Sequence, residues 1–458
     1  MSNEISETDP IIQYRDVSDS ENLGSKLCNP RKAFFRYFAL IFMCLLSFGS
    51  YFCYDNPAAL QDNFKKDLKI TTATFTAFYS WYSWPNVVLC FLGGYLIDRV
   101  FGIRLGAMFF STLVLTGQLV FAFGALWNEI WLMNVGRFIF GIGGESLAVA
   151  QNTYAVAWFF GKELNLVFGL QLSIARLGST VNLIVMGPIY DAIGKTKTGY
   201  ECLGTALLIA ACTCVFSLGC AGILAILDKR RTNVVPSEPI KAGDEIKLSD
   251  ALKFPLPLWL VFIICVAFYC AVFPFISLGK VFFISKYDFS PVTANSADSI
   301  VYLISAFASP ICGFLVDLVG FNTVWVTGAI AATIGSHLLL AFTFINPFVA
   351  MILMGVSYSL LAASLWPMVA LIVPKHQLGT AYGLMQSVQN LGLACISLLT
   401  GIIVDEAGYF VLEVFFLGSL CIALLCAFTL YFVDSYRGGI LGVSKKRRQE
   451  LQKMTSEE

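Results

Sequence analysis

The sequence RFIFGIGGESLAVAQNTY at residues 137–154 sits inside an apolar run that starts near Trp131 and ends near Phe159. A run of this length can cross a bilayer as a helix. It contains two ionisable residues, Arg137 and Glu145, and such groups are costly in a membrane unless they face a protein interior or an aqueous cavity. The stretch therefore predicts a membrane-spanning helix with a functional face turned toward other helices.

Glu145 is the only carboxylate that we place deep within a membrane span. Its expected counter-charge is Arg176, which lies about eleven residues into the next apolar run and so ~16 Å deep at about 1.5 Å per residue. Gly141, Gly143 and Gly144 leave the backbone bare beside Glu145, which permits close approach of a helix or a ligand. An acid and a base near mid-membrane predict a site for a ligand that carries both charges. The alternative is a buried salt bridge that only locks two helices together.

Composition places the chain among polytopic membrane proteins. Of its 458 residues, 57% are hydrophobic and only 13% are charged, and its mean hydropathy is +0.74. The net charge of zero gives no indication of a nucleic-acid partner. The 14 cysteines are mostly scattered along apolar runs, and the two histidines cannot build a His-based metal site. We therefore expect no metal and no cofactor, and we expect His337 to be a satisfied interior histidine.

Twelve apolar runs alternate with polar segments and predict twelve membrane-spanning helices in an all-α membrane protein. A polar linker divides the runs into two sets of six. The first set lies at about 34–57, 73–97, 104–126, 131–157, 165–188 and 201–227, and the second lies at about 257–284, 293–316, 323–345, 348–373, 378–404 and 409–433.

The predicted organisation is two six-helix bundles with both termini in the cytosol. It comprises a cytosolic tail at 1–33, a first bundle at 34–227, a cytosolic linker at 228–256, a second bundle at 257–433 and a cytosolic tail at 434–458. In this orientation most of the 30 Lys and Arg residues fall on the cytosolic side, as the positive-inside rule requires. Only Arg137, Arg176 and Lys280 fall within spans.

The two halves repeat each other. Residues 168–178 align without a gap on residues 382–392. The same offset places Gly141 on Gly355, Glu145 on Ser359, Asn152 on Trp366 and Arg176 on Asn390. Parallel repeats related by an axis along the membrane normal bind substrate between the halves at mid-depth. The repeat therefore predicts that Trp366 and Asn390 face Asn152 and Arg176 across a cavity. It could also reflect helix packing alone, because glycine-rich faces recur in membrane bundles.

Three motifs resemble signatures of the major facilitator superfamily. They are Asp98-Arg99-x-x-Gly102-x-Arg104 after the second run, Arg137-x-x-x-Gly141-x-Gly143 in the fourth and Gly187-Pro188 in the fifth. Stretches at 49–57, 81–86, 144–154 and 365–369 closely resemble the lysosomal dipeptide transporters within that superfamily. The resemblance implies transport of dipeptides from lysosome to cytosol by alternating access. It also implies a conformational role for Asp98, Arg99, Gly102, Arg104 and Arg137, and a glycosylated lysosomal membrane protein as accessory subunit.

Two further features concern location and partners. Glu7-Thr-Asp-Pro-Ile11-Ile12 resembles the acidic dileucine signal that adaptor proteins read when they sort cargo to lysosomes, with Ile-Ile in place of the usual pair. The chain contains no Asn-x-Ser/Thr acceptor for N-glycosylation. A glycosylated partner could shield its lumenal loops from proteases, although short loops could also need no shield.

The predicted substrate site combines two charges with aromatic and amide groups. Glu145 would hold the ammonium of a dipeptide, and the planar fork of Arg176 would hold its carboxylate. Lys280 could add a contact, or its side chain could extend to the lumenal interface. Asn152 and Asn390 would line the cavity, and its aromatic walls would come from Tyr54, Tyr302, Trp366 and Tyr382.

Two other functions remain open at this stage. The fold could carry an amino acid or an organic anion, or it could serve as a non-transporting receptor or scaffold. An enzyme is not expected, since no nucleophile–base set and no phosphate-cradling loop is present.

We expect uniport, because the first span has no Glu-x-x-Glu-Arg signature of proton-coupled peptide transporters. Arg176 should keep Glu145 ionised. Asp55 and Glu413 lie nearer the lumenal ends, where they would pair locally or face water.

Overall fold

The structure is a computed structural model in which most of the chain is described. Within the described part the secondary structure is helical, apart from one isolated β-bridge. The sorting residues Glu7, Ile11 and Ile12 and the loop residues Asp98 and Arg99 lie outside it, so their roles stay predictions. The described residues are 33–95, 102–159, 164–234, 254–373, 378–436, 438–444, 446–447 and 450.

Ten helices form the first half of the chain. They are α2 (Ala33–Leu45), α3 (Phe48–Tyr54), α4 (Asn56–Ala59), α5 (Gln61–Leu68), α6 (Thr72–Ser83), α7 (Asn86–Tyr95), α8 (Gly102–Leu126), α9 (Ile130–Phe159), α10 (Leu164–Ile193) and α11 (Tyr200–Val234).

Five longer helices form the second half. They are α13 (Leu256–Tyr287), α14 (Pro291–Val319), α15 (Asn322–Phe342), α16 (Pro347–Ile372) and α17 (Leu378–Tyr436). The last of these contains a break at Gly408, whose φ of 80° and ψ of 178° are open to glycine but not to other residues.

Within the described residues, nine helical stretches are long and apolar enough to cross a membrane. The α2–α3 pair counts as one of these stretches, and α17 as another. The 30-residue helix α9 is not among the nine, and it contains the polar residues Arg137, Glu145, Gln151 and Asn152. The all-α membrane class predicted from composition is confirmed.

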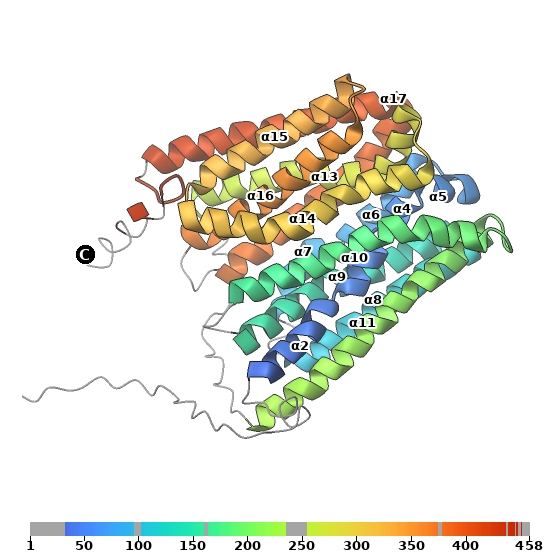
Figure 1. Ribbon diagram of the computed structural model, residues 1–458, viewed down its shortest axis with the longest axis horizontal. Helices are drawn as coiled ribbons and strands as arrows, with labels where there is room; N and C mark the ends of the chain where they lie inside the picture. Colours follow the sequence, from blue (N-terminus) through green and yellow to red (C-terminus); the bar gives the residue numbers. More distant parts are fainter. Residues whose placement is uncertain are drawn as a thin grey trace, which may run out of the picture.

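The two halves of the chain occupy different halves of the molecule (Figure 1). Helices α2 and α8–α11, drawn from blue to green, lie below α13–α16, drawn from yellow-green to orange, and α4–α6 lie at the level of α14. The halves meet where α6 and α7 pack against α17 and where α10 packs against α14. A site between the halves is therefore built from these helices and from their immediate neighbours.

Glycines allow helices to touch backbone to backbone at matching places in the two halves. A Cβ added at Gly141 of α9 would collide with the carbonyl oxygen of Tyr82 in α6. At the position predicted to match, Gly355 of α16, an added Cβ would lie 2.9 Å from Cβ of Ile304 in α14. The bare backbone beside Glu145 thus admits a neighbouring helix, and this part of the sequence repeat reflects helix packing.

Candidate functional site

Glu145 connects the two halves of the molecule. Its side chain lies half-buried on α9, where Tyr82 Oη of α6 donates a hydrogen bond to Oε1 at 3.2 Å. Gln386 Nε2 of α17 donates to Oε2 at 3.2 Å. The two bonds are long for donors to a carboxylate, which usually lie nearer 2.7–2.9 Å. Both hydrogen-bond partners of Glu145 among the described residues are thus neutral groups.

Arg176 lies on α10 and faces the second half of the chain. Its guanidinium carbon is 4.4 Å from the ring centre of Tyr358 on α16, a close cation–π contact. The side chain is largely buried, and its Nε and Nη1 atoms have no hydrogen-bond partner. Tyr358 also interacts with Arg176 through a side-chain hydrogen bond, so Nε and Nη1 are the nitrogens left for a carboxylate.

Glu145 and Arg176 form no ion pair with each other; each of these two described side chains has the other partners given above. The expectation that Arg176 neutralises Glu145 directly is wrong in this conformation. Tyr51 of α3 lies close enough to interact electrostatically with both charges. The arrangement is a separated acid and base with tyrosines around them, which fits a ligand with an ammonium and a carboxylate better than it fits a structural salt bridge.

Aromatic side chains of the second half surround the Arg176 end. The rings of Trp366 and Tyr382 stack with centroids 6.3 Å apart and an interplanar angle of 16°. Trp366 Nε1 donates to Tyr269 Oη at 3.0 Å, and the Tyr269 ring packs edge-on against Tyr358 at 5.9 Å. Trp366 and Tyr382 are therefore connected through Tyr269 to Tyr358, whose ring contacts the Arg176 guanidinium.

The two predicted asparagines lie on opposite sides of the domain interface. Asn152 is exposed and lies seven residues after Glu145, which is nearly two helical turns and so the same face of α9. Asn390 is buried on α17, where its Nδ2 donates to the Gln386 carbonyl at 3.0 Å and lies 3.7 Å from Cys90 Sγ of α7. Both residues lie on helices of the interface, and their contact with substrate stays a prediction.

Arg137 and Tyr54 belong to an aromatic cage inside the first half. The Arg137 side chain is fully buried, and its guanidinium carbon lies 5.3–5.7 Å from the centres of five aromatic rings. Its nitrogens donate to three backbone carbonyls. The rings are those of Tyr54, Tyr79, Tyr82, Phe121 and Phe140. The cage holds α3, α6, α8 and α9 together. Tyr54, which was expected to line the substrate site, therefore packs against the Arg137 guanidinium.

Lys280 was expected either to contact the substrate or to extend to the lumenal interface, and in this structure it does neither. Its Nζ lies 2.5 Å from Oδ1 of Asp62 and donates to the Ala59 carbonyl at 2.8 Å, and its side chain is 1% exposed. It therefore does not extend to a membrane interface, and its charge is taken by the α4–α5 segment of the other half. In this conformation Lys280 joins the halves and is not free to bind a ligand.

The same end of the molecule is closed by further contacts between the halves. Both oxygens of Asp405 on α17 accept from the first backbone N–H groups of α6, at 2.9 Å from Thr72 and 2.7 Å from Ala73. Gln61 of α5 donates to Tyr409 Oη at 3.3 Å and accepts from the Val281 amide at 3.1 Å. We call this set of contacts, together with Lys280 and Asp62, the α4–α5 gate.

Tyr302 and Asp55 lie close to this gate. Tyr302 is buried on α14, and its hydroxyl faces the Asp55 carboxylate together with that of Ser179. Asp55 is 2% exposed, so the expectation that it could face water is wrong here. Asp298, also on α14, is a fully buried carboxylate. Burial of a carboxylate is therefore not confined to Glu145.

At the opposite end of the first half, Arg104 of the predicted conformational motif forms an ion pair. Its Nε lies 2.7 Å from Oδ2 of Asp228 on α11, and Trp158 Nε1 donates to the other oxygen of that carboxylate at 2.9 Å. Gly102 begins α8 with a φ of 67°, a value that favours glycine. The ion pair explains the need for an arginine at position 104, and the positive φ explains the glycine at position 102.

The second half contains one buried acid–base pair within its core. His337 Nδ1 and Glu413 Oε2 are 2.8 Å apart, and both side chains are almost completely buried. His337 is an interior histidine as expected, but only Nδ1 is paired and Nε2 has no hydrogen-bond partner; Glu413 pairs locally. Among the described residues, no group of three or more His, Cys, Asp or Glu could hold a metal ion.

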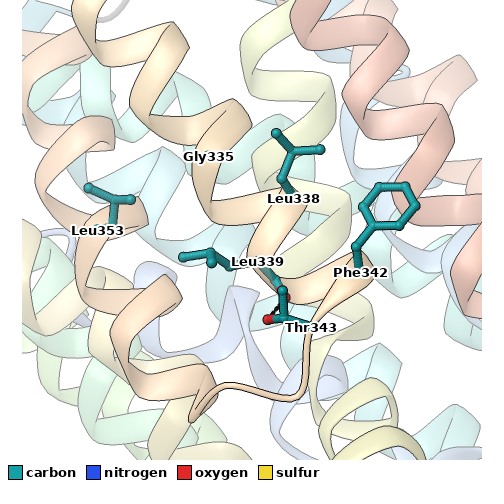
Figure 2. Close-up of a pocket in the computed structure, with 6 residues that line it drawn as sticks. All are labelled: Gly335, Leu338, Leu339, Phe342, Thr343 and Leu353. Carbon is teal, nitrogen blue, oxygen red and sulfur yellow. Dashed lines mark hydrogen bonds between the residues drawn. The ribbon is translucent and has the colours of Figure 1, made fainter.

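A groove on α15 and α16 has a different character (Figure 2). It is lined by Gly335, Leu338, Leu339, Phe342, Thr343 and Leu353. Its surface is almost entirely apolar, and Leu338 and Phe342 are exposed on the outside of the molecule. A surface of this kind suits lipid chains and has no charged group for a zwitterion.

Sequence analysis missed several residues of the site. Tyr82, Gln386 and Tyr358 contact the two predicted charges directly. Gln386 lies one helical turn before Asn390, so helical periodicity could have indicated it. Tyr358 directly precedes Ser359, the residue that the repeat aligns with Glu145.

Comparisons with known proteins agree with this architecture. The family model of the Major Facilitator Superfamily matches residues 40–297 and 275–453. A zebrafish (Danio rerio) protein named Lysosomal dipeptide transporter MFSD1 is 60% identical over 429 residues, which cover 93% of each chain. The human (Homo sapiens) protein of the same name is 58% identical over 427 residues, which cover 93% of this chain and 92% of the human one.

Two solved transporter structures share the fold. The nucleoside transporter NupG superposes with a TM-score of 0.62 at 16% identity, covering 86% of this chain and 99% of NupG. The tetrameric PepTSo2 superposes with a TM-score of 0.63 at 14% identity, covering 88% of this chain and 99% of its own. At this level of identity the likeness concerns the fold alone.

Proposed function

The chain belongs to the major facilitator superfamily, with relatives named lysosomal dipeptide transporter MFSD1, and from this premise we propose that it exports dipeptides from the lysosomal lumen to the cytosol. The observation that carries the proposal is the separated charge pair between the halves. Among the described residues, the hydrogen-bond partners of Glu145 are neutral, and Nε and Nη1 of Arg176 have no hydrogen-bond partner.

A dipeptide zwitterion matches this pair at both ends. Its ammonium displaces Gln386 or Tyr82 from the Glu145 carboxylate and forms a charge-assisted bond, and its carboxylate meets the unpartnered nitrogens of Arg176. Trp366 and Tyr382 form the aromatic wall next to the Arg176 end. The termini of the substrate are read and its side chains are not, so many dipeptides fit.

The other functions make different demands on the site. A single amino acid carries the same two charges, but they are closer together than in a dipeptide. An organic anion needs Arg176 and has no use for Glu145. A receptor or scaffold that does not transport would need neither charge, although both charges remain costly to bury. The fitness of the site for two separated charges favours the dipeptide.

We also propose the membrane topology. Counting α2–α3 and α6–α7 as one span each, and α17 as two spans around Gly408, gives twelve spans. They divide into bundles at 34–227 and 257–433, joined by a cytosolic linker at 228–256. Both terminal segments, 1–33 and 434–458, lie in the cytosol, and the α4–α5 gate lies on the lumenal side.

Transport proceeds by alternating access of the site to the two sides of the membrane. The α4–α5 gate holds the lumenal side closed in this structure. Asn152 is exposed on the cytosolic side of Glu145, on the same face of α9, which supports a state that faces the cytosol. Opening of the gate would expose Glu145 and Arg176 to lumenal dipeptides.

The proposed mode is uniport. The first span has no Glu-x-x-Glu-Arg signature of proton-coupled peptide transporters, which supports uniport. Lysosomal proteolysis supplies dipeptides continually, so their own gradient drives export. The carrier is assigned to the lysosomal membrane as a multi-pass protein. A glycosylated lysosomal membrane protein serves as its accessory subunit, and adaptor proteins read Glu7, Ile11 and Ile12.

Dipeptides blocked at one end test the assignment of the two charges. Uptake into proteoliposomes is compared for a free dipeptide, its C-terminal amide and its N-acetyl form. The wild type should discriminate against both blocked forms by ~10-fold or more, because a hydrogen bond to a charged group contributes about 1.5–3 kcal/mol. Arg176→Ala should lose discrimination against the amide and keep discrimination against the N-acetyl form.

The experiment has a matched control and a clear contrary result. Arg231→Ala removes a half-buried arginine that contacts Asp228 and is outside the site, and it should keep both preferences. Equal uptake of all three peptides by the wild type would contradict recognition of the peptide ends. Uptake of a single amino acid in preference to any dipeptide would favour the alternative substrate class.

A further inference from the structure

A second acid is buried between the halves, beside the α4–α5 gate. The side chain of Asp298 on α14 is fully buried, and neither of its carboxylate oxygens has a hydrogen-bond partner. A Cβ added at Gly279 of α13 would lie 2.7 Å from Oδ1 of Asp298 and 3.0 Å from Oδ2. The carboxylate therefore packs against a bare stretch of backbone, where a side chain would leave it no room.

Other oxygens without a hydrogen-bond donor lie near it. Asn295, one turn earlier on α14, donates to the Ala59 carbonyl at 2.9 Å, and its own Oδ1 has no partner. Asp55, between α3 and α4, has an unpartnered Oδ2 and interacts electrostatically with Asp298. The two carboxylates come from opposite halves of the molecule and approach each other only when the halves are together at this end.

The positive charges nearby do not neutralise Asp298. Lys280 follows Gly279 in sequence, but its Nζ is held by Asp62 at 2.5 Å. Asp191 of α10 also acts electrostatically on Lys280 and adds no positive charge to the site.

Asp55 likewise forms no ion pair with a basic side chain among the described residues. Arg137 acts on it electrostatically, but the Arg137 nitrogens donate to backbone carbonyls within the aromatic cage. Ser179 of α10 and Tyr302 of α14 face the Asp55 carboxylate with neutral hydroxyl groups. Two acids thus share one buried region, and no basic side chain of the described residues is bound to either.

An ionised carboxylate without partners is very costly to bury, and in proteins such a group takes up a proton instead. We propose that Asp298, together with Asp55, forms a proton-binding site that takes one proton from lumenal water as the α4–α5 gate closes. The proton sits on a carboxylate oxygen of Asp298, which interacts electrostatically with Asp55. When the gate opens, water reaches the pair and the proton returns to the lumen.

The proton does not cross the membrane in this cycle. Asp298 is 0% exposed in the closed state, so it has no contact with water on the cytosolic side. The site therefore makes the gate sensitive to lumenal pH and leaves the carrier a uniporter. An acidic lumen favours the closed gate, and a neutral lumen favours the open one. The sidedness of this inference rests on the orientation given under the proposed function.

The gate itself can be observed without any substrate. Fluorophores are attached through non-canonical amino acids at the exposed positions Lys66 of α5 and Asp288 after α13, and their energy transfer is measured in nanodiscs from pH 5 to pH 7. In the wild type the ratio of closed to open molecules should fall as pH rises, by at most ~10-fold per pH unit for one proton. Asp298→Asn mimics the protonated acid, so its gate should stay closed over the whole range.

Matched variants keep the test decisive. Glu201→Gln removes an exposed carboxylate at the start of α11 and should leave the wild-type pH response unchanged. If Asp298→Asn does not fold, Asp55→Asn replaces it and should reduce the pH response, because the facing acid is lost. Wild-type pH dependence in a folded Asp298→Asn protein would overturn the proposal.

A proton flux measurement tests whether the proton crosses the membrane or returns to the lumen. Proteoliposomes loaded with a pH dye should show no proton entry during dipeptide uptake. A dipeptide-driven proton flux that Asp298→Asn abolishes would mean that the proton crosses the membrane, and would overturn return to the lumen. Because the fluorescence experiment contains no dipeptide, its result is independent of whether dipeptides are the substrate.

Discussion

Gln386 and Glu145 are 241 residues apart in sequence and share a 3.2 Å hydrogen bond across the interface of the two halves. The glutamine lies on α17 and the glutamate on α9, so the bond exists only while these helices are close. A substrate ammonium would compete with the glutamine for the same carboxylate. Gln386 therefore binds the Glu145 carboxylate at the position that a substrate ammonium would take.

We expect Glu145→Gln to reduce dipeptide affinity by ~10-fold or more, since a neutral amide cannot form the charge-assisted bond to an ammonium, which contributes about 1.5–3 kcal/mol. The amide can still bond to Tyr82 and Gln386, so the thermal melting temperature should change little. Binding is measured by dipeptide-induced thermal shift and transport by vesicle uptake. Glu129→Gln, an exposed site at the turn before α9, is the matched control. Wild-type affinity in Glu145→Gln would make this carboxylate purely structural.

Tyr358 should act mainly through its ring, although its hydroxyl also interacts with Arg176. Tyr358→Phe keeps the aromatic face 4.4 Å from the Arg176 guanidinium carbon and should retain most transport. Tyr358→Leu removes a partly desolvated cation–π contact, which contributes roughly 0.5–2 kcal/mol, and should raise the KM for dipeptides by ~3- to 30-fold. Uptake kinetics of the two variants provide the comparison. An equal loss in both variants would assign the effect to the hydroxyl.

Gly401 should tolerate no side chain, because α17 touches α6 there. A Cβ at Gly401 would lie 2.6 Å from the Ala73 Cα and would collide with Thr76 Oγ1. Gly401→Ala should therefore push the halves apart and destabilise the closed gate by about 1–3 kcal/mol. Gly418→Ala in the same helix meets no atom within 4 Å and serves as control. The populations of closed and open gate, measured by the fluorescence assay, should change for the first variant only.

Asp405 should protect the first turn of α6 from solvent exchange. Its two oxygens accept from the Thr72 and Ala73 amides across the domain interface. Asp405→Ala should speed hydrogen–deuterium exchange of these two amides, with a stability change of about 0.5–2 kcal/mol, as for the loss of a helix cap. Glu406→Gln, the exposed neighbour, should leave exchange unchanged. Unaltered exchange in Asp405→Ala would show that the cap contributes nothing.

The sequence predicted the class, the family and the two charges of the site, because these depend on patterns within single helices. Depth in an apolar run identified Glu145 and Arg176, and the glycines beside Glu145 indicated a close helix contact. Contacts between residues on different helices could not be predicted from patterns within single helices. Gln386 and Tyr358 approach the charges only through the packing of α17 and α16 on the first half.

Burial at the α4–α5 gate was the least predictable feature. Asp298 lies near the start of its apolar run, where counting residues suggests access to water. Lys280 was expected either to touch substrate or to extend outward. Both are buried, and Lys280 contacts α4 and α5, which are short, partly polar helices with no membrane signature in the sequence. Only the three-dimensional arrangement shows that a connector between two spans seals the end of the molecule.

The aromatic cage around Arg137 has a consequence for a protein that works in an acidic organelle. Ring faces and backbone carbonyls hold the guanidinium, and neither kind of partner gains or loses a proton between pH 4 and pH 8. These direct contacts therefore do not change with protonation over that range, although the Asp55 carboxylate also interacts electrostatically with Arg137. A carboxylate in the place of those rings would make assembly of the first bundle dependent on the route the protein travels through the cell.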